Sequence, residues 1–259
     1  MLLLRSGIAE GRAGKRLSFN IGSPITAVFP KAMGPINAYK GLQISHYLQV
    51  SPDRGFIFET WFNPPMFQST AMPGWWEDHW KNMHRYDRMT CTGVLVGSES
   101  NAEVRMAGLT GREVRYRPTQ KDFDTMLDGL ELAGEIYLAA GAEAVMPNSF
   151  DYYEYKTIEQ LKLMKYDIKD NSDLTLGTGH PQGGNILSRN KKIGVVDEHL
   201  KVYGYDNLFI SDASVIPIAV GVNPQITVMT IADYAVPFVA QNLEAGDIKI
   251  IQPELNVVE

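Results

Sequence analysis

The sequence has little cysteine, little excess charge and no long apolar run. Cys91 is the single cysteine among 259 residues, so internal disulfides are excluded and neither a zinc site nor any other metal site is predicted. The formal net charge of -6 argues against general nucleic-acid binding, because that function needs a basic face. No stretch of about 18 or more apolar residues occurs, so no transmembrane span is predicted.

The N-terminal segment has only four apolar residues before Arg5. The apolar region of a secretory signal needs about 7 to 15 residues, so no export signal is predicted and we expect a cytoplasmic protein. Hydrophobic residues make up 44% of the chain, which favours a globular protein over a disordered one. The length allows a large core in one or two domains.

Turn signals divide the chain into short strands and a few helices. Segments rich in β-branched and aromatic residues predict strands over residues 25–29, 42–50, 55–62, 90–96, 102–106, 113–117, 207–211 and 248–251. Helices are predicted over residues 75–88, 119–140, 157–165 and 224–243. In the second of these helices, Thr119 and Asp122 match a capping box, and the apolar residues recur at three- and four-residue spacing.

The residue types that carry chemistry are densest between Gly177 and Val236. Asn223 and Pro224 suit a helix start, because Asn caps well and the missing N–H of Pro is not needed there. The apolar residues that follow recur on one side, which predicts a largely buried helix. A buried helix N-terminus offers free N–H groups and about half a positive charge to an anion. A plain core helix with a good cap explains the same pattern.

His180 lies between Gly179 and Pro181, and Pro181 favours an extended backbone at the histidine. A histidine in such a loop can act as a general base near neutral pH, but backbone groups of a turn can equally satisfy it. Asp212 follows the predicted strand 207–211, and open α/β sheets bind ligands at the carboxyl ends of their strands. A hydrolase that uses His180 with Asp212 is disfavoured, because no nucleophile motif accompanies them.

The order of these motifs is more specific than any one of them. The sequence carries G-H-P-Q-G-G, then V-V-D, then N-L-F-I-S-D-A-S-V-I-P, then V-N-P-Q-I-T. This order and spacing resembles the C-terminal half of the glucose–methanol–choline (GMC) family of flavin oxidoreductases, and is most similar to its cholesterol-oxidase-like branch. Near the N-terminus, L-L-L-R-S-G-I resembles the second signature of the family, with Ala9 in place of a glycine.

The resemblance implies an α+β fold in two parts. Residues 21–171 would form a substrate-binding domain with an antiparallel or mixed sheet and helices. Residues 1–20 and 172–259 would form part of a Rossmann-like FAD-binding domain and give it its C-terminal strand and helix. The N-terminal ADP-binding half with its G-x-G-x-x-G fingerprint is absent from the sequence. The alternative to a self-sufficient enzyme is therefore a truncated or split, non-catalytic module that needs a separate FAD-binding chain or segment.

The resemblance also implies a cofactor, a reaction and site residues. The cofactor would be FAD, and the reaction would be oxidation of a small-molecule alcohol by proton abstraction and hydride transfer to the flavin. The catalytic residues His180 and Asn223 would face the flavin ring, with His180 accepting the proton or positioning the hydroxyl. Asp212 and Ala213 would meet the cofactor through backbone groups. Pro224 and Gln225, with Asn223, would bring the helix N-terminus to the developing negative charge.

Two further features bear on the substrate. Sterol-oxidising members of the family also use a carboxylate from the substrate domain, and Glu59 is the candidate; a paired structural or exposed glutamate is the alternative. Aromatic residues crowd into the same region, where they either line a site for a bulky apolar alcohol or form the core of the domain. They are Tyr47, Phe56, Phe58, Trp61, Phe62, Phe67, Trp75, Trp76 and Trp80.

Overall fold

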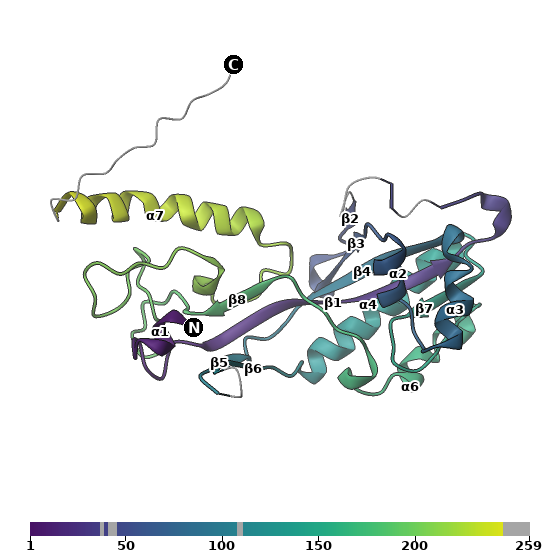
Figure 1. The fold of residues 1–259 in the computed structure, drawn as a ribbon, viewed down its shortest axis with the longest axis horizontal. Helices are drawn as coiled ribbons and strands as arrows, with labels where there is room; N and C mark the ends of the chain where they lie inside the picture. Colours follow the sequence, from purple (N-terminus) through teal and green to yellow (C-terminus); the bar gives the residue numbers. More distant parts are fainter. Residues whose placement is uncertain (37–38, 41–45, 108–110, 246–259) are drawn as a thin grey trace, which may run out of the picture.

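A six-stranded antiparallel sheet and one long helix organise the computed structural model, which describes residues 1–36, 39–40, 46–107 and 111–245 (Figure 1). The strands are β1 (Lys15–Val28), β2 (Tyr47–Leu48), β3 (Phe56–Thr60), β4 (Met89–Gly97), β5 (Glu103–Arg105), β6 (Glu113–Arg115), β7 (Ala144–Pro147) and β8 (Pro181–Gly184). The helices are α1 (Leu2–Arg5), α2 (Pro65–Thr70), α3 (Glu77–Met83), α4 (Gln120–Ala139), α5 (Ile158–Leu161), α6 (Met164–Asp167) and α7 (Gln225–Ala245). This mixture of helices and antiparallel sheet confirms the predicted α+β class.

The long strand β1 runs through both halves of the molecule (Figure 1). Its second part pairs with β4 and β7, and its first part pairs with β8. One apolar core lies between the sheet and α4, and a second lies among residues near the N-terminus and in the C-terminal third of the chain, including Leu3, Val196 and Ala235. The predicted boundary at residues 20 and 21 falls inside β1, and the domain assignment stays a prediction.

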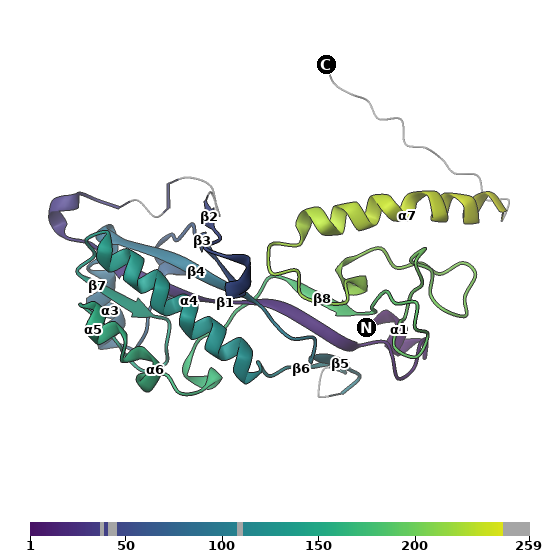
Figure 2. The ribbon, with the colours of Figure 1, turned by 180° about the vertical axis from the view of Figure 1, so that it is seen from behind.

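The two faces of the sheet are covered differently. Helix α4 lies across one face (Figure 2), where its apolar stripe packs on Ile25, Phe58 and Val94. Within α4, Gly129 allows close contact, because a Cβ there would lie 2.4 Å from a methyl of Val94. On the opposite face, Met72 closes over β1, β4 and β7 after α2. The rest of that face carries the candidate site.

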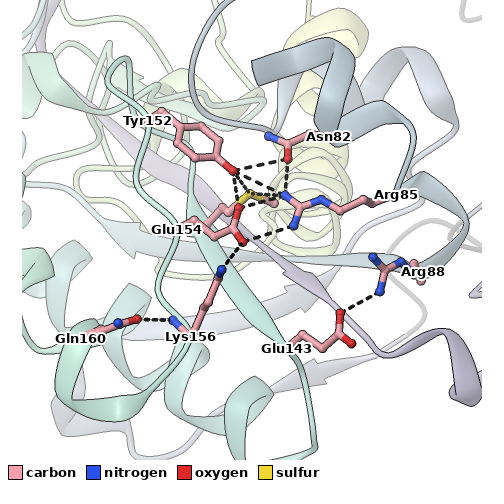
Figure 3. A network of polar contacts seen from close by, with 9 residues as sticks. Asn82, Arg85, Arg88, Glu143, Tyr152, Glu154, Lys156 and Gln160 are labelled. Carbon is pink, nitrogen blue, oxygen red and sulfur yellow. Dashed lines mark hydrogen bonds and ion pairs between the residues drawn. The ribbon is translucent and has the colours of Figure 1, made fainter. Parts of the chain in front are cut away.

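A polar network fastens α3 to the segment after β7 (Figure 3). Arg85 forms an ion pair with Glu154, with 3.0 Å between Nη2 and Oε2, and also donates to Asn82. The hydroxyl of Tyr152 donates to the same carboxylate. Both charged side chains are largely shielded from solvent, so loss of either one would leave its partner buried and unpaired, which is costly.

The sequence patterns predicted the long helix well and the sheet unevenly. Helix α4 and its capping box between Thr119 and Asp122 are confirmed. The helix predicted over 75–88 ends at Met83, and the one over 157–165 is divided into α5 and α6. Residues 207–211 form no strand, only an isolated bridge between Lys201 and Phe209, so that prediction is wrong. The strand predicted over 248–251 lies outside the described residues.

The prediction of a largely buried C-terminal helix is also wrong. One side of α7 is held by the preceding loops, since Tyr234 donates to the carbonyl of Glu198 and Ala235 is buried. Its apolar residues Ile226, Met229 and Val236 are 73%, 61% and 60% exposed. The periodic pattern therefore marks a face that nothing in the described chain covers. Within the described ranges, no helix meets the length and apolarity needed to cross a membrane.

Candidate active site

A hollow of about 290 Å³ lies on the open part of the sheet, beside the loop that carries His180. Backbone hydrogen bonds between Gly22 and Gly177 fix this loop against β1, with N to O distances of 2.7 and 2.9 Å. The lining residues come from three strands and the loop: Asn20, Gly22, Glu59, Trp61, Leu95, Gly177, Thr178, Gly179 and His180. Residues far apart in the sequence thus meet at one hollow.

Glu59 brings a carboxyl group to this hollow from β3. Its side chain is 3% exposed, and burial raises its pKa because the charged form loses hydration. A hydrogen bond from the amide of Asn223 opposes this effect by stabilising the carboxylate. A buried carboxyl with a raised pKa and one polar partner is typical of a group that exchanges protons in a functional site.

His180 lines the same hollow, and its predicted ligand-facing role stays a prediction. Its backbone N–H donates to the hydroxyl of Thr178 at 3.0 Å. Burial lowers the pKa of the imidazole, which keeps the ring neutral near pH 7. Its Nδ1 atom is buried and has no hydrogen-bond partner among the described residues. Because buried polar atoms are almost always satisfied, this atom points to a missing ligand or water.

Trp61 forms a flat apolar wall of the hollow because β4 carries glycine opposite Glu59. A Cβ at Gly93 would lie 2.3 to 2.5 Å from three indole atoms, so only glycine lets the ring lie on the sheet. Trp61 belongs to the aromatic cluster noted in the sequence. The members of this cluster lie in different surroundings in the structure. Phe56 and Phe58 belong to the core against α4, whereas Trp75 and Trp76 are exposed.

A second hollow, of about 320 Å³, lies near the other end of β8 and contains Asp212 and Ala213. The carboxylate of Asp212 accepts from the N–H of Ser214 at 2.7 Å and so shapes a single turn, Ala213–Val215. Gly183 and Gly184 of β8 also line this hollow. Because β8 starts directly after His180, one short strand connects the two hollows.

Helix α7 begins at Gln225, one residue later than the sequence pattern predicted. The carbonyl of Pro224 accepts the first helical bond, from the N–H of Val228 at 2.8 Å. The cap position therefore belongs to Pro224, and Asn223 lies before it with its amide on Glu59. The N–H groups of the first turn have no partners within the helix, so an acceptor can bind them.

The raised pKa of Glu59 predicts that Glu59→Gln stabilises the chain at neutral pH. As pH rises, the carboxyl loses its proton in the unfolded chain, with a pKa near 4.3, at a lower pH than in the folded chain. The free-energy cost of burying the ionised Glu59 is therefore absent at low pH and complete above the pKa of the folded chain. We expect a rise in Tm of about 2–4 °C at pH 7. The rise should vanish towards pH 4 in a thermal unfolding series. The exposed control Glu10→Gln should change Tm little at either pH, and an equal rise at both pH values in Glu59→Gln would contradict the burial argument.

Comparison with known proteins places this geometry in a family. A model of the GMC oxidoreductase family matches residues 100–232, which is half of the chain. Long-chain-alcohol oxidase FAO3 of Arabidopsis thaliana is 27% identical over 95% of this chain and 35% of its own length. A cholesterol oxidase of Acinetobacter baumannii is 34% identical over 24% of this chain and 11% of its own length.

Solved structures agree on the fold. A formate oxidase of Aspergillus oryzae RIB40 superimposes with a TM-score of 0.60 over 90% of this chain and 48% of its own, at 17% identity. This chain spans about a third of the length of curated relatives such as the Arabidopsis oxidase. The family match and the shared fold agree with the motif order in the sequence, and the chain belongs to the GMC oxidoreductase family.

Proposed function

We propose that this chain forms the substrate side and part of the flavin wall of an FAD-dependent oxidoreductase acting on the CH–OH group of an alcohol. The observation that carries the proposal is the meeting of Glu59 and His180 at one hollow, with Asn223 beside Glu59. Buried Glu59 accepts from Asn223, and the ring of His180 lines the same hollow, with an Nδ1 that has no partner in the part of the chain that the structure describes. The names of two relatives, a long-chain-alcohol oxidase and a cholesterol oxidase, support an alcohol as the substrate class.

The residues present fit a flavin. A Cβ at Gly177 or Gly179 would meet nothing within 4 Å, so the loop before His180 offers open backbone to a flat ring. The first turn of α7, from Gln225, provides N–H donors and the positive end of a helix for an electron-rich edge. In the second hollow, Asp212 and Ala213 would hold the ribityl–diphosphate portion through backbone groups. When bound, FAD supplies the hydride acceptor.

In the proposed reaction, His180 and Asn223 bind the hydroxyl group of the alcohol, and His180 accepts its proton. Neutral His180 can accept a hydrogen bond and then a proton from the alcohol, because burial keeps its imidazole unprotonated. Asn223 has a second amide hydrogen available for the alcohol oxygen while the first remains on Glu59. The Glu59 carboxyl lines the same hollow, and a carboxylate there can accept a further hydrogen bond besides that of Asn223. Each role needs the alcohol oxygen within hydrogen-bond reach of these groups.

The wall of the hollow favours an apolar alcohol. Trp61 and Leu95 line it alongside the polar groups, and an apolar wall with a few polar groups is typical of a small-molecule site. In this arrangement residues 21–171 serve as the substrate-binding domain. Residues 1–20 and 172–259 contribute to the FAD-binding domain.

A second candidate function is a module that completes its site only with a separate flavin-binding chain or segment. The exposed apolar face of α7 favours it, since Ile226, Met229 and Val236 form a stripe on a helix that starts beside the site. Contiguous apolar surface of this kind marks a contact with another protein surface. The same residues would then be catalytic in the assembly and inactive in the isolated chain.

A visible spectrum of the purified chain separates the two candidates. A self-sufficient enzyme should show a blue-region flavin band after FAD is added and the excess removed, and an alcohol should bleach that band without oxygen. A chain that stays colourless with FAD would overturn self-sufficiency. Bleaching regained only with a flavin-binding partner would establish the second candidate. A flavin band that no alcohol bleaches would contradict alcohol oxidation.

A further inference from the structure

Asn20 of β1 is a buried polar residue in a strand, and its side chain serves a loop distant in the sequence. It is 1% exposed and lies opposite Gly97 of β4. Its amide Nδ2 donates to the carbonyl of Val222, and its Oδ1 accepts from the N–H of Gly221 at 3.1 Å. One planar side chain thus binds the segment directly before Asn223 at two points.

The backbone of the same residue holds the other loop of the site. The carbonyl of Asn20 accepts from the hydroxyl of Thr178 at 2.8 Å. That hydroxyl oxygen accepts from the N–H of His180 at 3.0 Å. Asn20 is therefore hydrogen-bonded both to the loop that carries His180 and to the loop that carries Asn223.

Two residues near Asn20, Gly97 and Gln182, also contact the loop before Asn223. A Cβ at Gly97 would lie 3.3 Å from the Cα of Gly221, so glycine lets the loop rest on the sheet. Gln182 is fully buried, and its Oε1 accepts from the N–H of Val220 at 3.1 Å. Gly221 itself has a φ of +73°, a conformation that glycine adopts without strain. The loop is held at Val220, Gly221 and Val222, and Asn20 binds the two residues directly before Asn223.

We propose that Asn20 is a positioning residue of the oxidation site, which sets Asn223 against Glu59 and in register with His180. The inference rests on the proposed function, in which these three groups act on one alcohol. The physical reason is that a buried amide satisfied at both ends fixes its partners in one geometry, whereas its loss leaves Gly221 N–H and Val222 C=O unpaired. The loop then gains conformations in which Asn223 leaves Glu59.

The test is made on the full chain without cofactor, with Asn20→Ala and Asn20→Asp. The aspartate keeps the acceptor for Gly221 but loses the donor to Val222, and it remains informative if the alanine variant does not fold. Amide exchange at Gly221 is expected to speed up about tenfold in Asn20→Ala, which corresponds to the loss of one buried hydrogen bond. Carboxyl-resolved NMR titration is expected to find the pKa of Glu59 raised in Asn20→Ala, because Asn223 no longer stabilises its carboxylate. In Asn20→Asp the added carboxylate would itself raise that pKa, so this variant is read by amide exchange, which should stay slow at Gly221 because its acceptor is kept.

The matched control is Asn148→Ala. Asn148 is buried directly after β7 of the same sheet, and its amide donates to the carbonyl of Thr70 at 2.9 Å, outside the residues that line the site. It should lower stability comparably but leave the titration of Glu59 unchanged. A merely structural role for Asn20 predicts that the two residues behave alike, and that result would overturn the proposal.

A double-mutant cycle with Asn223→Ala completes the design. If Asn20 acts through Asn223, the pKa of Glu59 rises in Asn223→Ala and does not rise further when Asn20→Ala is added. A rise in Asn223→Ala with none in Asn20→Ala would refute the positioning role alone. No change in either variant would refute the Glu59–Asn223 contact on which the proposed function depends.

Discussion

Replacing His180 with alanine is expected to slow the alcohol-dependent reduction of bound flavin by about 10²–10⁴-fold. In the proposed function the imidazole takes the hydroxyl proton, because it lines the hollow and burial lowers its pKa. FAD retention should change far less, since His180 carries no charge that would hold the diphosphate. Anaerobic stopped-flow reduction and a flavin release assay, on the chain or on its complex with a flavin-binding partner, measure the two quantities separately.

The control histidine is His84, which is exposed and hydrogen-bonded through Nδ1 to the carbonyl of Trp80 at 2.8 Å. His84→Ala should leave both the rate and the flavin content near those of the original chain. Equal losses of reduction rate and FAD retention in His180→Ala would mean that the histidine is structural. The backbone bond from His180 to Thr178 survives the substitution, so the loop itself should stay in place.

Substitution of Gly183 by alanine is expected to destabilise the chain by about 2–5 kcal/mol. A Cβ at this position would lie 2.2 Å from the carbonyl oxygen of Arg16 on the paired strand, and the residue has a φ of +79°. Both the backbone strain and the clash act on the pairing of β1 with β8, which connects the two hollows. Thermal unfolding followed by circular dichroism measures the loss.

Gly184→Ala is the control that separates the cost of backbone strain from the cost of the steric clash with Arg16. Gly184 has a φ of +96°, but its Cβ would meet nothing closer than 3.6 Å. Gly184→Ala should therefore cost only the backbone strain, about 1–2 kcal/mol. Equal destabilisation in the two variants would mean that the contact with Arg16 relaxes without cost and that β1 and β8 are not tightly coupled.

Local patterns predicted the elements whose stability is local. The capping box of Thr119 and Asp122 and the spacing of the apolar residues predict helix α4 from the sequence. Both patterns involve residues only a few positions apart. Strand β1 was predicted only from residue 25, since Gly22 and Pro24 interrupt the pattern. Pro24 is accommodated because β7 pairs with β1 only from Ile25 onward. Strands β7 and β8 and helix α2 were not predicted.

Some of the site residues can likewise be predicted from local sequence patterns, and others cannot. The sequence brought out His180 and Asn223 through glycine, proline and capping signals, and it offered Glu59 only by its chemistry. No sequence pattern marks Asn20 or Trp61 as a site residue. Polar residues in strands and aromatic residues in clusters are both common. Their roles depend on pairings between β1, β3 and β4, which no short window of sequence contains.

The sequence by itself determined the α+β class, the long helix α4 and the motif order that marks the family. Each of these depends on neighbouring residues or on a fixed order along the chain. Only the tertiary structure decided that Glu59 accepts from Asn223, that Asn20 binds both loops, and that residues 1–36, 39–40, 46–107 and 111–245 leave the apolar face of α7 exposed. The physical reason is that burial and hydrogen-bond partners come from residues distant in sequence, and the closure of the sheet selects which of them meet.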